Sequence, residues 1–226
     1  MKERPVQQVL ESVKNIPDVA VRLEAISGRF LGRPYVVNPL IGSADVPEEF
    51  IATLGGFDCV TYVETALALA GARSANDFIR RLKGIRYEGG EVVWRRRNHY
   101  MTNWIRNNAN AGYVSRMSLR APSRSKERVL NILPGLRPQT QRFSCIPKKA
   151  LRPIADRIRS GDLIFFASTR PHLDVFHCGI IVRDGDRLLL RHASRSQGGV
   201  VEQELSTFLN ANRMAGVILV RPTEVP

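Results

Sequence analysis

One cysteine and two histidines are the residues of this chain whose types and spacing could support nucleophilic chemistry. Cys59 directly follows Asp58, and apolar residues with helical spacing continue after it. Asp58 can therefore cap a helix whose first turn holds the cysteine. The positive end of a helix dipole and its free N–H groups favour a thiolate, so we expect the pKa of Cys59 to fall. The Asp58 carboxylate opposes this effect, so a base from elsewhere in the chain is needed.

The base is expected in a β-hairpin near the end of the chain. Asp184 and Gly185 separate two apolar runs, which is a strong signal for a two-residue turn. With that turn, His177 stands directly opposite His192, on one face of the sheet, with Cβ atoms about 4.5–5.5 Å apart. A slip of one residue would put the two rings on opposite faces. The same alternation places Cys178 on the other face, where we interpret it as a structural thiol.

Together these residues predict a Cys–His–His catalytic arrangement. The thiolate of Cys59 would attack a carbonyl, His177 would keep the thiol deprotonated and then protonate the leaving amine, and His192 would orient His177. Backbone N–H groups at the helix start would face the developing oxyanion. Three other interpretations stay open: a buried structural cysteine, a hydrogen-bonded pair of structural histidines, and a zinc site with these three residues as ligands. We favour catalysis and expect neither a cofactor nor a metal ion.

Composition and charge limit the class of protein and of partner. The 226 residues, 43% hydrophobic and 24% charged, suit one domain with a full core or two small ones. The net charge of +13 would attract polyanions, namely nucleic acid, anionic lipid or an acidic cell-wall polymer. The chain has no nucleic-acid-binding motif, so we expect no specific nucleic-acid partner. The three cysteines form no disulfide framework and no metal-ligand spacing. The oligomeric state stays open.

The elements that must position these residues are helices first and antiparallel strands later, a pattern typical of an α+β fold. Helices are expected at 6–13, 19–30, 59–70, 74–85, 99–105 and 205–209, and strands at 163–166, 177–182, 187–192, around 200 and at 216–220. Residues 86–97 are expected to form a strand and a turn around Gly89-Gly90. Residues 33–56 form an irregular loop that leads to Cys59, and 112–153 are short strands and loops. The chain shows no domain linker. We therefore expect one domain over 1–226, with 1–32 as a helical N-terminal extension.

No stretch approaches the ~18 apolar residues of a membrane span, and the charged N-terminus shows no apolar signal core. Two locations stay open: the cell envelope, as a periplasmic or secreted protein whose export signal was removed, or the cytoplasm.

Four short motifs, in this order, resemble the NlpC/P60 superfamily of papain-like cysteine peptidases and amidases. They are Asp58-Cys59, Gly161-Asp162-Leu163, His177-Cys178-Gly179-Ile180 and His192-Ala193-Ser194. Within that superfamily, residues 57–64, 97–100 and 174–177 resemble the DUF1460 family, which is described as N-acetylmuramoyl-L-alanine amidase-like. The resemblance covers roughly residues 33–220.

This resemblance implies a papain-like fold, in which the helix bearing Cys59 packs on an antiparallel sheet bearing His177 and His192. It also implies a peptidoglycan amide as substrate, either the MurNAc–L-Ala bond or a bond within the stem peptide. Two alternatives remain. One is a non-catalytic cell-wall binding module of the same fold, and the other is a thiol acyltransferase.

The resemblance also points to supporting residues. Arg97 and His99 fall in the family signature, and we place them at the rim of the cleft. Arg97 would hold a substrate carboxylate or is one more charge in a basic run, and we interpret His99 as a structural hydrogen-bonding residue. Asp174 would support His177 or cap a turn.

Four residues depart from the family pattern or fit it poorly. Val60 and Thr61 stand where the superfamily usually has Ser-Gly, and Asn103 stands where the narrower family has Asp. The superfamily uses an upstream Tyr at the oxyanion pocket. Tyr35 is the nearest upstream tyrosine, but its spacing from Cys59 is long.

Overall fold

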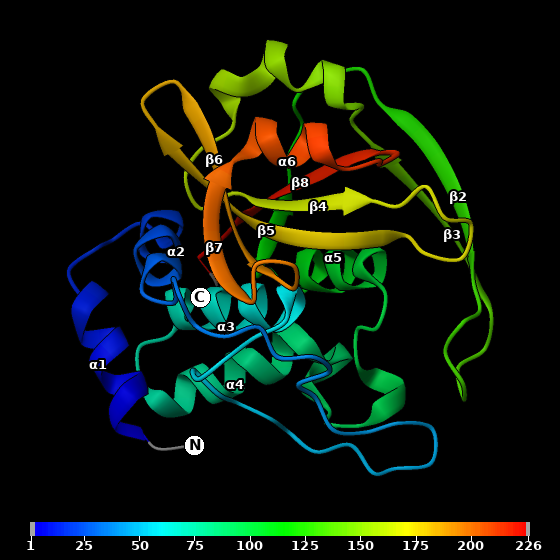
Figure 1. Ribbon diagram of the computed structural model, residues 1–226. Coiled ribbons are helices and arrows are strands. Elements are labelled where there is room, and N and C mark those ends of the chain that lie inside the picture. Colours follow the sequence, from blue (N-terminus) through cyan, green and yellow to red (C-terminus); the bar gives the residue numbers. More distant parts are fainter. Residues whose placement is uncertain (1–2, 225–226) are drawn as a thin grey trace.

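The computed structural model describes residues 3–224. Its centre is an antiparallel sheet in the order β1-β8-β4-β5-β6-β7 (Figure 1). The strands are β1 (Val114–Arg116), β4 (Leu163–Ala167), β5 (Val175–Asp184), β6 (Arg187–Ser194), β7 (Gly199–Glu204) and β8 (Gly216–Pro222). With helices preceding most of these strands, the predicted α+β class is confirmed.

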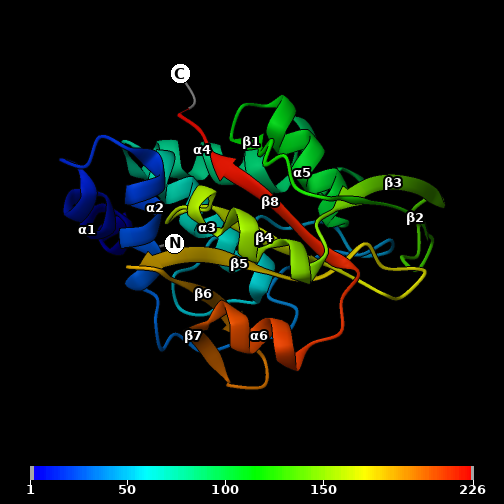
Figure 2. The ribbon, with the colours of Figure 1, turned by 90° about the horizontal axis from the view of Figure 1, so that it is seen from above.

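Helices cover both faces of the sheet, and the central one is α3 (Cys59–Gly71). Every α3 residue from 61 to 70 is buried, because the helix is apolar nearly all round. The others are α1 (Glu3–Val13), α2 (Val19–Gly28), α4 (Ala75–Arg86), α5 (Met101–Asn110) and α6 (Leu205–Ala211). In Figure 1, α3 and α4 lie below the sheet and α6 above it, and Figure 2 shows α6 on the near side. None of the helices within 3–224 is long and apolar enough to cross a membrane.

The two faces of the sheet carry separate hydrophobic cores. Cys178 and Ile180 of β5 pack in the core that contains α3. Ile181, one residue further along, packs in the core that contains Phe208 of α6. The alternation of a β-strand thus decides which side chains of β5 face α3 and which face α6.

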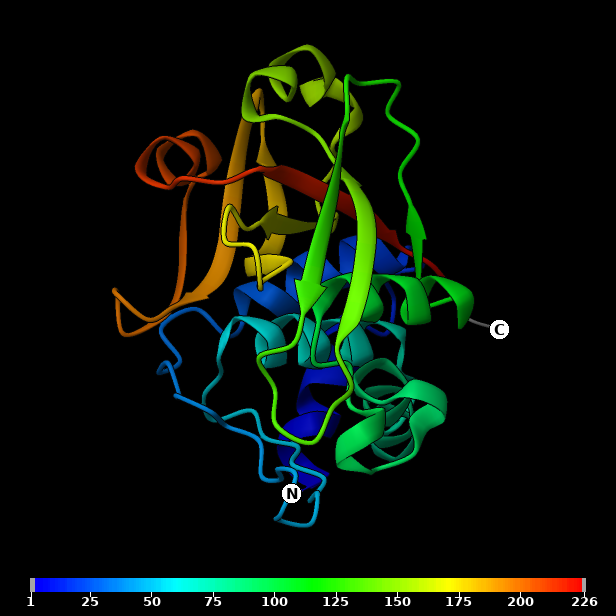
Figure 3. The ribbon, with the colours of Figure 1, turned by 90° about the vertical axis from the view of Figure 1, so that its right-hand side faces the viewer.

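A two-stranded ribbon stands beside the main sheet, formed by β2 (Arg124–Leu130) and β3 (Gln139–Cys145) (Figure 3). It agrees with the short strands predicted for 112–153. Gly135, between the two strands, lies against Ala44 of the long loop before α3. The ribbon therefore packs against the same loop that leads into Cys59.

Within 86–97, the predicted strand is wrong, whereas the turn expected around Gly89-Gly90 is present. The segment forms two 3-10 turns, Glu88–Gly90 and Trp94–Arg96. Gly89 and Gly90 have φ angles of 67° and 73°, in the left-handed region that glycine tolerates and a strand does not use.

The hairpin between β5 and β6 turns one residue later than the sequence predicts. Asp184 pairs with Arg187, so the turn residues are Gly185 and Asp186. Gly185 has a φ of 58°, and Asp186 does not have a positive φ. This pattern is that of a type II′ turn, which prefers glycine at its first central position. The prediction of an Asp184-Gly185 turn is therefore wrong.

The predicted direct pairing of His177 with His192 is wrong for the same reason. Extending the observed register by one pair places Gly179 opposite His192, and His177 becomes a diagonal neighbour. Moving a two-residue turn by one position changes the pairing by two residues, and side chains two apart share a face. Both rings therefore still lie on the same face, against Phe208 of α6.

Candidate active site

The helix that carries the cysteine begins as the sequence predicts. Asp58 is its N-cap, and the Asp58 carboxylate accepts a hydrogen bond of 2.7 Å from the backbone N–H of Thr61. The Thr61 hydroxyl accepts one of 3.0 Å from the backbone N–H of Asp58. This reciprocal capping box satisfies two N–H groups of the first turn. Asp58 and Thr61 therefore fix the position at which Cys59 leaves the loop.

The surroundings of Cys59 favour its thiolate. A hydrogen bond from the Cys178 side chain is the largest cause that lowers the thiol pKa well below its usual range, and burial opposes it. A hydrogen bond and charge from His177 lower it further. The pKa of Cys178 moves the other way, chiefly because its thiol bonds to Cys59. Two adjacent thiols do not both ionise, and the negative charge rests on the one that faces the imidazole.

Cys178 lies on the face of β5 that was predicted for it, and it is buried under α3. Its Sγ atom is 3.2 Å from the carbonyl oxygen of Cys59. Sequence reasoning assigned it only a structural role and missed this contact with Cys59, because nothing in the local pattern shows which residue of α3 meets β5.

The two histidines form a hydrogen-bonded pair behind the cysteine. Nε2 of His177 is 2.6 Å from Nδ1 of His192, and the two rings are nearly perpendicular, at 86°. Phe166 and Phe208 stack on the His177 ring and fix its plane. Burial, and then the charge of His177, lower the pKa of His192 to about 3. His192 is therefore neutral near pH ~7.

Gln203 of β7 extends this chain of hydrogen bonds by one residue. Its Nε2 atom is 2.7 Å from Nε2 of His192. The side chain comes from the neighbouring strand, where Gln203 pairs with Leu190 of β6. Sequence reasoning missed it. Gln203 lies two positions after Val201, the residue that pairs with His192, so the two share a face of β7. Its contact with His192 can be predicted only once the register of β6 and β7 is known.

Tyr35 also lies at the site, although its distance from Cys59 in sequence left it unassigned. The backbone N–H of Val36 donates to Phe57 O, and that of Phe57 donates to Pro34 O, at 2.9 and 3.0 Å. The chain therefore loops out and returns beside Tyr35 just before Cys59. Burial raises the pKa of the Tyr35 phenol, and the negative charge of Cys59 raises it further.

Asp174 is buried and anchors two elements without contacting His177. One of its carboxylate oxygens accepts hydrogen bonds of 2.7 Å from both the backbone N–H and the hydroxyl of Thr102. The other accepts from the N–H of Val175. The sequence suggested that Asp174 supports His177 or caps a turn, and these contacts are those of a cap at the first turn of α5. Asn103 ties α5 to the ribbon through a 3.0 Å bond to Gln139.

Arg97 and His99 line a different cavity from the two histidines. They help to line a cavity of about 470 Å³ together with Asp58 and Val60. The Arg97 guanidinium pairs with Glu48 at 3.1 Å and stacks on Trp94, so internal partners occupy it. His99 donates to the Trp94 carbonyl oxygen at 2.7 Å, and burial lowers its pKa to about 4. Among residues 3–224, neither side chain is hydrogen-bonded to Cys59, His177 or His192.

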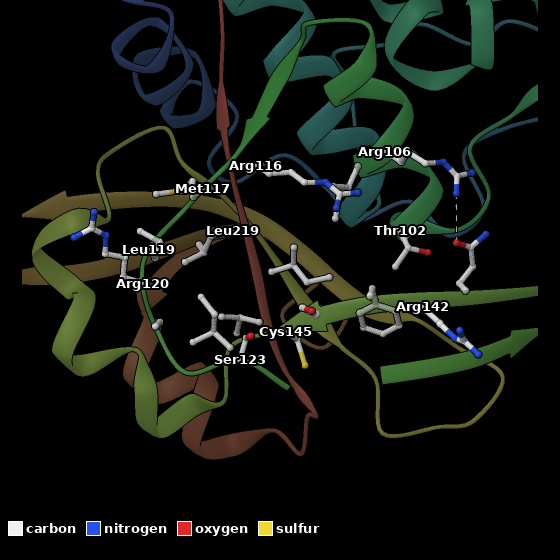
Figure 4. A pocket seen from close by; sticks show the side chains of 18 residues that line it. Thr102, Arg106, Arg116, Met117, Leu119, Arg120, Ser123, Arg142, Cys145 and Leu219 are labelled. Carbon is white, nitrogen blue, oxygen red and sulfur yellow. Dashed lines mark hydrogen bonds between the residues drawn. The ribbon is translucent and has the colours of Figure 1, made fainter. Parts of the chain in front are cut away.

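Two further cavities lie on the surface of the protein. A groove of about 550 Å³ adjoins the histidines. A separate cavity of about 470 Å³ lies between α5, β3 and β8, with Cys145 and Leu219 among its lining and arginines around it, and none of the three site residues lines it (Figure 4). Across residues 3–224, no group of three or more His, Cys, Asp or Glu side chains is arranged to hold a metal ion. The described part of the chain thus offers no ligand set for the zinc alternative.

Comparison with known proteins assigns the family. The sequence model of the AmiA-like family, described as N-acetylmuramoyl-L-alanine amidase-like, matches residues 25–217. The chain belongs to this family. The match includes Cys59, both histidines and the main sheet as far as the first two residues of β8. A search of curated proteins gives no significant match.

Several solved structures are similar to this chain in fold. An N-acetylmuramoyl-L-alanine amidase from Bacteroides uniformis shares 26% identity at a TM-score of 0.79, over 91% of this chain and 99% of that one. A putative xylanase from Bacteroides fragilis shares 27% identity at a TM-score of 0.76, over 86% and 98%. Protein LPG0564 from Legionella pneumophila, assigned to DUF1460, shares the fold at 21% identity, with a TM-score of 0.83 over 98% and 94%.

Proposed function

We propose that this AmiA-like protein is a cysteine amidase of the papain-like NlpC/P60 type that hydrolyses an amide bond of peptidoglycan. The observation that carries the proposal is the chain of contacts from Cys59 through His177 to His192. Cys59 starts α3, and a hydrogen bond and charge from His177 lower the pKa of its thiol. Nε2 of His177 is in turn 2.6 Å from Nδ1 of His192. The family match and the Bacteroides uniformis amidase support the substrate class.

In the first half of the reaction, the Cys59 thiolate attacks the carbonyl carbon of the amide. The negative charge moves to the carbonyl oxygen, where the backbone N–H groups at the start of α3 and the Tyr35 phenol can donate hydrogen bonds. His177, as an imidazolium, gives its proton to the departing amine. The C–N bond breaks and a thioester to Cys59 remains.

In the second half, neutral His177 removes a proton from a water molecule, which attacks the thioester carbonyl. The C–S bond breaks, the carboxylic acid leaves, and Cys59 returns as the thiolate beside an imidazolium. One water is consumed, and one acid and one amine are released.

His192 and Gln203 match the two protonation states of His177. When His177 is an imidazolium, its Nε2–H donates to Nδ1 of His192, whose own hydrogen is then on Nε2. That hydrogen needs an acceptor, which the Gln203 amide oxygen supplies after the amide rotates. In the orientation of this structure, the amide nitrogen donates to His192 instead. The amide can serve either tautomer, because it carries a donor and an acceptor.

The test is hydrolysis of purified peptidoglycan and of defined N-acetylmuramoyl peptides, with the products identified by mass spectrometry. We expect Cys59→Ala to abolish product formation while ligand binding remains. Cys145→Ala is the control, since this free thiol lies away from the site. If the parent protein forms no more product than Cys59→Ala does, the amidase proposal is refuted and the non-catalytic binding module is favoured. Transfer of the acyl group to an added amine in preference to water would identify the acyltransferase.

A further inference from the structure

We propose that the groove beside the histidines is an anion subsite in which Arg195 binds a carboxylate of the substrate. This inference rests on the proposed function, because it names the class of amide that the site accepts. The groove holds about 550 Å³ and is lined by Phe176, His177, His192, Ser194, Arg195, Ser196, Phe208 and Asn212.

The position of Arg195 is fixed by the strand that carries the orienting histidine. β6 ends at Ser194, and the turn that follows closes with a 3.3 Å hydrogen bond from the N–H of Gly198 to the Arg195 carbonyl oxygen. The carbonyl oxygen of Gly198 then accepts a 2.8 Å bond from the N–H of Tyr35. Tyr35 in turn pairs with Phe57, two residues before Cys59. Three backbone links thus connect the turn that carries Arg195 to the segment that leads into Cys59.

The Arg195 guanidinium is available to a ligand. Its side chain is exposed, and within residues 3–224 it forms no hydrogen bond and no ion pair. The neighbouring Arg191, by contrast, is engaged by Glu202 and by the Glu24 carbonyl oxygen. Arg97, which the sequence suggested for this role, is engaged by Glu48.

The charge around the groove suits an anion and no cation. No Asp or Glu side chain lines it. Burial and the charges of Cys59 and Asp58 raise the pKa of Tyr35, and Arg195 opposes them, which places its positive charge within electrostatic reach of the site. Phe176 and Phe208 supply an apolar floor. The groove therefore combines one free guanidinium, serine hydroxyls and aromatic surface.

A guanidinium fork matches a carboxylate with two parallel hydrogen bonds. Peptides attached to N-acetylmuramic acid carry free carboxylates along the peptide, whereas the carboxyl of the lactyl group is consumed in the amide bond. The subsite therefore selects amides whose peptide bears a free carboxylate close to the scissile bond. Amidation of that carboxyl removes the charge that Arg195 recognises.

The experiment compares N-acetylmuramoyl-L-alanyl-D-glutamate with the same compound in which both glutamate carboxyls are amidated. kcat/KM is measured in the parent protein, in Arg195→Gln and in Arg187→Gln. Arg187 is exposed at the opposite end of β6, so its replacement makes the same change of charge far from the groove. Binding of both compounds to Cys59→Ala and to Cys59→Ala/Arg195→Gln is followed by calorimetry.

We expect Arg195→Gln to lose about tenfold in kcat/KM on the acid, through KM, and to change little on the amide, as suits a charge-assisted bond at an exposed site. Arg187→Gln should behave as the parent. Equal loss on both compounds, or no loss on either, would overturn the subsite. If the parent cleaves neither compound, the amidase proposal fails on these substrates. The calorimetric binding measurement then still tests the subsite. The subsite predicts that Cys59→Ala binds the acid more tightly than the amide, and that this preference is lost in Cys59→Ala/Arg195→Gln.

Discussion

Gln203 gives the sharpest test of the hydrogen-bonded chain behind the nucleophile. Gln203→Met keeps the length of the side chain and removes both its donor and its acceptor. The Nε2 atom of His192, now 2.7 Å from the Gln203 amide, would lose its partner in a pocket where His192 is only 2% exposed. Leaving a buried polar group without a hydrogen bond costs about 1–3 kcal/mol.

The cost should fall mainly on the imidazolium state of His177. In that state His192 must carry its hydrogen on Nε2 and donate it, and methionine cannot accept it. A penalty of about 1–3 kcal/mol in the transition state lowers kcat by about 5- to 150-fold. KM should change little, because Gln203 does not line the groove.

The assay is kcat and KM as functions of pH for the parent, for Gln203→Met and for Gln197→Met. Gln197 lies in the exposed turn after β6, so the same substitution there tests for a nonspecific effect. We expect kcat to fall in Gln203→Met alone, with the thermal midpoint lowered by a few degrees at most. A kcat within twofold of the parent would refute the reasoning that His192 must hand its hydrogen to Gln203.

Other contacts lead to three further predictions. Cys178→Val removes the thiol that stabilises the Cys59 thiolate, so the pKa of Cys59 should rise and its alkylation near pH ~6 should slow; an unchanged rate would contradict the pairing of the two thiols. Thr61→Val breaks the capping box and should cost about 1 kcal/mol in urea unfolding, whereas a wild-type midpoint would contradict it. Arg86→Met leaves the buried Glu64 carboxylate without its ion-pair partner. In the parent, the Glu64 carboxylate is 2.7 Å from the Arg86 guanidinium, and both side chains are buried. This change should cost about 3–5 kcal/mol by thermal or chemical unfolding, and a loss below about 1 kcal/mol would show that the pair is not needed.

The parts of the site that depend on local sequence were predictable. Asp58 before an apolar helical run predicts both the cap and the position of Cys59, because capping involves residues only three apart. The shared face of His177 and His192 follows from the two-residue period of strands. Their direct pairing does not, because Asp184-Gly185-Asp186 permits two turns, and the preference of a type II′ turn for glycine at its first position selects the later one.

The parts that depend on packing between distant elements were not predictable. Cys178 meets Cys59 only because α3 crosses β5 at that point. Gln203 reaches His192 only because of the register between β6 and β7. The chain runs on from Tyr35 through a long loop and pairs with the Tyr35 segment again just before Cys59. For Arg97, the sequence showed a charge but not Glu48, the buried partner that occupies it.

The proposed mechanism requires that Cys59 and His177 form a thiolate–imidazolium pair. The most direct measurement is the rate of iodoacetamide labelling at each cysteine against pH, resolved by mass spectrometry, in the parent and in His177→Ala. We predict that Cys59 labels quickly near pH ~6 in the parent and slowly in the variant, because loss of His177 raises the thiol pKa. Labelling of Cys59 that follows an ordinary thiol, with a midpoint near pH ~8.5 in both proteins, would contradict the claim.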